Sequence, residues 1–77
     1  MRYLAIRADR HPTPDVWRNF VHRRDVPCPT CKMVYQLWAP VEPEQDEAAV
    51  KAQGSWLSGR LSEECPGHAD WFHSPDN

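Results

Sequence analysis

The sequence predicts a small α+β fold with two or three short strands and two helices. One stretch with alternating apolar residues, 2–8, and one rich in β-forming residues, 33–39, are predicted to be strands. Two further stretches, 14–23 and 44–63, have apolar residues at helical spacing. The chain has 77 residues, which is enough for one domain. A chain of this length buries only about 60% of the surface that its unfolded form exposes, so it usually needs a further stabilising element.

The two predicted strands rest on the spacing and type of their side chains. In 2–8, Leu4, Ile6 and Ala8 fall on the same side of an extended chain. The stretch 33–39 contains valine, tyrosine and tryptophan, which favour strands, and a proline follows it directly. We therefore expect both stretches to be extended.

The first helix is predicted over 14–23. Thr13 is a residue type that caps helices, and Pro14 is favoured at the first helical position. Apolar residues then occur at positions i, i+1, i+4 and i+5, namely Val16, Trp17, Phe20 and Val21. The alternative interpretation for 19–26 is a strand that leads into the first cysteine pair.

The second helix is predicted over 44–63. Acidic residues cluster near its start, where the helix dipole favours them, and Val50, Leu57 and Leu61 fall on one face. Gly54 lies on the same face, where a glycine destabilises a helix by roughly 1 kcal/mol relative to alanine. We expect Gly54 to allow close approach of a neighbouring element.

The charge of the chain is divided between its halves. Residues 1–32 hold seven basic and three acidic residues, whereas 33–77 hold two basic and eight acidic ones, within a formal net charge of -2. The simpler interpretation is that the two halves face each other or are both solvated. The alternative is a basic face that binds nucleic acid, formed by Arg2, Arg7, Arg18, Arg23, Arg24 and Lys32.

The three cysteines occur in two short runs of equal spacing. Cys28 and Cys31 form a C-x-x-C run, and Cys65 and His68 form a C-x-x-H run, each with proline after its first cysteine. At this spacing one tight turn can present two ligands to a single ion, and its backbone N–H groups can point at the sulfur atoms. Three thiolates and one imidazole suit a tetrahedral zinc site. We therefore predict that these four residues bind Zn²⁺ and stabilise the domain.

The C-P-x-C run of Cys28 and Cys31 resembles the metal-binding knuckle of zinc-ribbon and treble-clef modules, and the same turn in rubredoxins holds iron. The resemblance covers the two ligand runs and the strand after the first run. It implies that Cys28, Cys31, Cys65 and His68 are metal ligands, and it implies no specific activity. The chain departs from zinc ribbons in the long helix before the second pair. It departs from treble clefs because that pair follows the helix.

Other interpretations of the cysteines are three buried thiols in the core, a redox C-x-x-C without Cys65, and an iron site. An odd number of cysteines argues against a disulfide framework, and the βαβ context of thioredoxin-like proteins is missing. His11, His22 and His73 are expected at the surface. His73 follows His68 by five residues and could replace it as a ligand.

The four tryptophans, Trp17, Trp38, Trp56 and Trp71, are expected to build the core, because three of them lie in predicted helices or strands. The alternative is an aromatic patch for a partner, and Trp71 with Phe72 is the best candidate. Exposure of Trp71 and Phe72 would favour self-association.

Together, these features predict a non-enzymatic zinc protein that acts as a protein-interaction adaptor or accessory module. Four protein ligands leave no open metal position for catalysis, and the H-x-E half of the zinc deaminase signature is missing. A nucleic-acid-binding module is the second hypothesis, and an enzyme or metal-handling protein is the third.

The expected organisation is a single zinc-binding domain over 1–72 and a flexible C-terminal tail over 73–77. No apolar run reaches the roughly 20 residues of a membrane helix, and the first residues lack the apolar segment of a secretory signal. Cysteines kept for a metal rather than for disulfides predict a reduced, cytoplasmic location.

Overall fold

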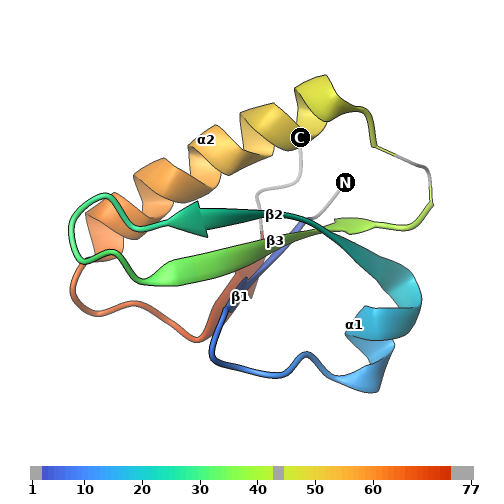
Figure 1. Cartoon of the computed structure of the whole chain (residues 1–77), viewed down its shortest axis with the longest axis horizontal. Coiled ribbons are helices and arrows are strands. Elements are labelled where there is room, and N and C mark those ends of the chain that lie inside the picture. Colours follow the sequence, from blue (N-terminus) through green and yellow to red (C-terminus); the bar gives the residue numbers. More distant parts are fainter. Residues whose placement is uncertain (1–2, 43–44, 74–77) are drawn as a thin grey trace.

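The computed structural model describes residues 3–42 and 45–73. Its elements in chain order are β1 (Leu4–Arg7), α1 (Pro14–Asn19), β2 (Phe20–Pro27), β3 (Val34–Pro40), α2 (Glu47–Glu64) and β4 (Trp71–His73). The strands form one antiparallel sheet in the order β2-β3-β1-β4. Helix α2 lies along one face of this sheet, and α1 lies on the other side near one end (Figure 1). The predicted α+β class with two helices is confirmed, and β4 is a short additional strand.

The helix predicted over 14–23 is shorter than expected, because α1 ends at Asn19. Thr13 occupies the N-cap position as predicted, but its side chain makes no capping hydrogen bond. From Phe20 the backbone is extended and pairs with β3. Pairing over the length of β2 satisfies more backbone groups than one further helical turn would, so the alternative of a strand over 19–26 is correct.

The hydrophobic core lies between α2 and one face of the sheet. The helix contributes Val50, Leu57 and Leu61, which confirms the predicted apolar face, and all three are fully or almost fully buried. Fully burying such an aliphatic side chain contributes about 1.5–3 kcal/mol. The buried cluster comprises Tyr3, Ala5, Val26, Cys28, Tyr35, Leu37, Ala39, Val50, Leu57 and Leu61.

Helix α2 packs against strand β2 at Gly54, the position at which the sequence predicted a neighbouring element. A Cβ atom built on Gly54 would lie 3.4 Å from Cδ of Arg24 and 4.0 Å from Cγ2 of Val26. A β-bulge between His22 and Arg24 interrupts the register of β2 with β3. Such a bulge re-aims the side chains that follow it, and here the stem of Arg24 packs against the helix.

The other face of the sheet is covered only in part. Leu4 and Ile6 of β1 are paired across the sheet with His73 and Trp71 of β4, so these four side chains share that face. His73, which the sequence placed at the start of the tail, is therefore part of the sheet. The remainder of the predicted tail, 74–77, lies outside the described residues.

Trp17 is not a core residue, although its place on the apolar stripe of 14–23 predicted a core position. Its side chain is 66% exposed, and α1 contains no buried residue. Val16, the preceding residue, is half-buried and lines a cavity beside the sheet, and adjacent positions of a helix point in different directions. Trp71 is also exposed, at 57%.

Candidate metal centre

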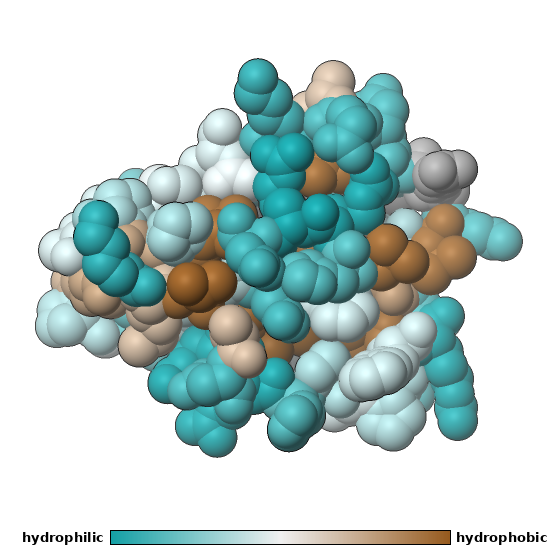
Figure 2. Space-filling view, in the orientation of Figure 1, coloured by the Kyte–Doolittle hydropathy of each residue, from teal (hydrophilic) through white to brown (hydrophobic). Residues whose placement is uncertain are grey.

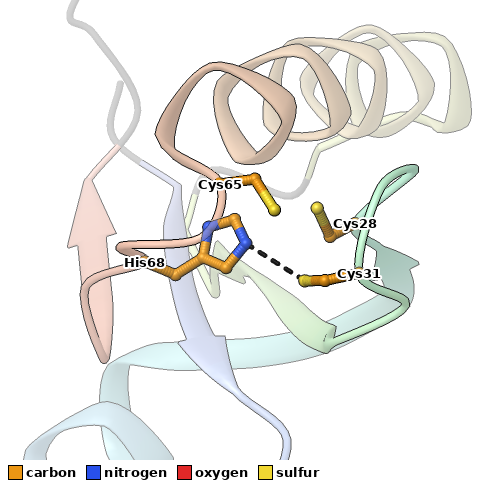
Figure 3. Close-up of side chains that lie close together, drawn as sticks. All are labelled: Cys28, Cys31, Cys65 and His68. Atoms are coloured by element: carbon orange, nitrogen blue, oxygen red, sulfur yellow. Dashed lines mark hydrogen bonds between the residues drawn. The ribbon is translucent and has the colours of Figure 1, made fainter.

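Cys28, Cys31, Cys65 and His68 come together at one end of the sheet. The first two lie where the chain turns between β2 and β3, Cys65 directly follows α2, and His68 lies in the loop before β4. Figure 3 shows the four side chains pointing toward one another. One ligand atom from each residue lies within 4.8 Å of the other three. Zinc with Zn–S bonds of about 2.3 Å holds tetrahedral ligand atoms roughly 3.8 Å apart, so the cluster is compatible with a Cys₃His metal site.

The turn between β2 and β3 is folded tightly enough to present two cysteines from one side. The backbone N–H of Cys28 donates to the carbonyl oxygen of Met33 at 2.8 Å, and that of Lys32 donates to the carbonyl oxygen of Cys28 at 3.0 Å. Lys32 has a φ of 68°, which lies in the left-handed region that glycine adopts more easily. The turn therefore forms although its sequence has no glycine.

The thiols of the cluster differ in acidity. Burial raises the pKa of Cys28, but backbone N–H groups of Cys31 and Thr30 and the side chains of Cys31 and His68 lower it to about 6. These N–H groups are the ones that the turn was expected to direct at sulfur. Burial and the neighbouring thiols raise the pKa of Cys65 to about 11. A cation bound beside Cys65 would favour its thiolate form and so oppose the effect of burial and of the neighbouring thiols.

Exposure also differs among the four side chains. All three cysteines are free thiols; Cys28 is buried, Cys65 is half-buried and Cys31 is exposed. His68 is half-buried, and its Nε2 atom lies 3.4 Å from Sγ of Cys31. Its Nδ1 atom is buried and has no hydrogen-bond partner within the described part of the chain.

The loop that carries His68 is attached to the sheet by contacts that the sequence did not reveal. Tyr35 is fully buried, its ring meets that of His68 edge-on with centroids 5.9 Å apart, and its hydroxyl donates to the carbonyl oxygen of Ala69. Arg7 donates from its backbone N–H to the carbonyl oxygen of Asp70 at 2.9 Å. The only sequence signal for Tyr35 was its place in a predicted strand.

The other histidines lie away from this cluster. His73 belongs to β4, where its ring packs edge-on against Trp71 with centroids 5.3 Å apart. His22 stacks on Trp38, with ring centroids 5.4 Å apart, and its Nε2 atom lies 2.8 Å from Asp25. The metal-ligand grouping found in the described residues includes His68 and not His73.

The proposed basic face is largely neutralised by acids from the second half of the chain. Arg23 and Arg24 both pair with Glu47, at 2.6 and 3.4 Å. Arg7 pairs with Asp70 at 3.2 Å. These contacts support the simpler interpretation, in which the two halves face each other.

The remaining basic candidates do not gather on one surface. Arg18 lies on α1 and Lys32 in the turn between β2 and β3, and these two segments lie at opposite ends of the sheet (Figure 1). Arg2 lies outside the described residues. The structure therefore does not bring together the five of these six residues that it describes.

Comparison of the chain with protein-family models, with curated proteins and with solved structures finds no match. No family match thus supports the resemblance to zinc-ribbon and treble-clef modules, and what the structure supports is a cluster compatible with a Cys₃His metal site. Among the described residues, no helix has the length and apolar character needed to cross a membrane.

Proposed function

We propose that this chain is a small non-enzymatic zinc protein whose metal holds the fold together and whose surface binds another protein. The observation that carries the proposal is the convergence of four ligand atoms within 4.8 Å from two distant segments of the chain. Cys₃His is a donor set typical of structural zinc, and an imidazole among three thiolates favours zinc over iron.

A structural role for the metal is supported by what the ligands would connect. Cys28 and Cys31 lie between β2 and β3, whereas Cys65 and His68 lie between α2 and β4. Binding of structural zinc contributes about 10–16 kcal/mol in small peptides, which is comparable with the whole stability of a small domain. Four protein ligands also fill a tetrahedral shell, whereas a catalytic zinc keeps one position open.

The surface chemistry supports a protein partner rather than nucleic acid. Figure 2 shows a largely hydrophilic face interrupted by hydrophobic patches. Arginines that would contact phosphate are paired with Asp70 and Glu47. Among the side chains that the structure describes, the large apolar ones that remain exposed are Trp17, Val21, Val34, Val41 and Trp71. Exposed apolar surface of this kind is typical of protein contacts.

The proposed structural zinc is tested on protein purified without added metal. Elemental analysis measures the metal content, and an HSQC spectrum recorded before and after EDTA reports whether the fold depends on the metal. We expect one zinc per chain and dispersed peaks that collapse on chelation. His68→Asn should lower the zinc content, whereas His73→Asn, a histidine outside the cluster, should leave it unchanged. A metal-free protein with an unchanged spectrum would refute the structural zinc.

The nucleic-acid alternative is tested by binding to mixed DNA and RNA at low salt. A phosphate-binding face loses affinity steeply between about 50 and 200 mM salt. We expect no binding at low salt, because Arg7, Arg23 and Arg24 already have acidic partners. Tight binding with a steep salt dependence would replace the protein-interaction role with the nucleic-acid one.

A further inference from the structure

A cavity of about 460 Å³ opens on the partly covered face of the sheet, between α1 and β4. Leu4 and Ile6 of β1 line it, and both are almost fully buried although they lie outside the core cluster under α2. Val16 and Phe20 form one wall, and Trp71 contributes to the other. The cavity is therefore a second apolar region of the molecule, and it faces outward.

A large apolar side chain projects beside this cavity. Trp17 is 66% exposed, and its indole N–H donates to the carbonyl oxygen of Pro12 at 3.1 Å. A smaller hollow is lined by Pro12, Pro14, Trp17 and Arg18. Because Pro12 lines both spaces, the projecting indole and the cavity belong to one continuous surface, here named the α1 face.

Two opposite charges on the α1 face have no ion-pair partner within the described residues. Asp15 lines the cavity and Arg18 lines the hollow beside Trp17, and the ion pairs found in the structure involve neither. By contrast, Arg10, also on this face, pairs with Asp70 at 3.5 Å. Among the described residues of the α1 face, Asp15 and Arg18 are thus an acid and a base without ion-pair partners, and Arg18 lies beside the projecting indole.

We propose that the α1 face is the contact between two copies of this chain related by a twofold axis. Trp17 of each copy enters the cavity of the other, and Asp15 of each copy pairs with Arg18 of the other. The proposal rests on the protein-interaction role proposed above and is independent of the metal. It names a second copy as the partner.

A second copy fits this face because the surface is complementary to itself. In a twofold contact the same patch of surface lies on both copies. A patch that binds itself must therefore contain both a projection and a cavity that receives it, and both an acid and a base that can pair. The α1 face has both pairs. A stable contact covers roughly 800 Å² per copy, which a chain with a total accessible surface of 4975 Å² can supply.

The first test is sedimentation velocity of the zinc-loaded chain over about two orders of magnitude in concentration. We expect the mass to rise from one copy toward two. Trp17→Ala should weaken association by about thirtyfold or more, as for a central interface tryptophan. Val34→Ala, at an exposed valine of β3 that lines neither hollow, should not change it. A wild-type chain that stays monomeric throughout would overturn the proposal.

The second test uses charge reversal and identifies the partner as a second copy. Asp15→Arg and Arg18→Asp should each weaken self-association, because each places like charges across the twofold contact. An equimolar mixture of the two variants should associate again, because each copy then presents the charge that the other lacks. A mixture of folded variants that fails to associate would refute the proposed pairing.

The two proposals fail in distinguishable ways. A chain that dimerises through Trp17 but holds no zinc would refute the structural metal and leave the dimer. A zinc-loaded monomer that binds a different protein through the α1 face would refute the dimer and leave the proposed function. HSQC spectra of every variant establish that it is folded before its association is compared.

Discussion

The hydroxyl of Tyr35 donates a hydrogen bond to the carbonyl oxygen of Ala69, the residue that follows His68. A fully buried side chain of β3 thus holds the loop that supplies the fourth ligand of the cluster. The edge-on contact between the Tyr35 and His68 rings limits the orientation of the imidazole. Groups that orient a metal ligand in this way influence affinity without touching the metal.

Tyr35→Phe is therefore expected to weaken metal binding by about tenfold or more while the fold is kept. The substitution removes only the hydroxyl, so the ring contact with His68 remains. Competition of the chain with a chelator for zinc measures the affinity, and the absorption of the cobalt-loaded chain reports the ligand set. An unchanged affinity would mean that the hydroxyl does not position the loop.

Cys65→Ser should leave the domain unfolded or without fixed side-chain packing. The substitution removes a thiolate ligand from a site that we propose supplies most of the stability. Loss of HSQC dispersion together with loss of zinc is the expected result. A well-folded, metal-free Cys65→Ser chain would contradict the structural role of the metal.

Arg7→Gln should raise the pKa of Asp9 toward its ordinary value. The hydrogen bonds from the Arg7 guanidinium lower the pKa of this carboxyl, with a further contribution from its positive charge. A carboxyl whose pKa is lowered by folding stabilises the protein above its unfolded-state pKa, and this stabilisation is lost as the pH falls through the folded value.

The stability difference between wild type and Arg7→Gln should therefore shrink as the pH falls through the pKa of Asp9 in the wild type. NMR titration of the carboxyl carbons measures the shift, and urea unfolding at several pH values measures the stability difference. Lys51→Gln is the matched control, because exposed Lys51 does not contribute to the lowered pKa of Asp9. Equal titration of Asp9 in wild type and Arg7→Gln would refute the interaction.

Gly59→Ala should stabilise the chain by up to about 1 kcal/mol, because alanine favours a helix over glycine. A Cβ atom built at Gly59 meets nothing within 4 Å. Gly54→Leu should destabilise the chain instead, since its side chain would enter the space taken by Arg24 and Val26. Urea unfolding of both variants measures these changes, and equal effects at the two positions would contradict the close packing of α2 on β2.

The sequence by itself determined the chemistry of the candidate site and most of the local structure. Cys28, Cys31, Cys65 and His68 are recognisable because ligand type and spacing are local properties of the chain. The same holds for α2, whose apolar face follows from helical periodicity. Local patterns suffice where one interaction, such as the burial of a single face, decides the conformation.

Only the tertiary structure decided the features that depend on distant pairing. The boundary between α1 and β2 is set by pairing with β3, which outweighs a helical stripe that continues past Asn19. The position of Tyr35 beside His68, the pairing of Arg23 with Glu47 and the exposure of Trp17 follow from which strands and helices become neighbours. These contacts join residues far apart in the chain, so no local pattern of side chains encodes them.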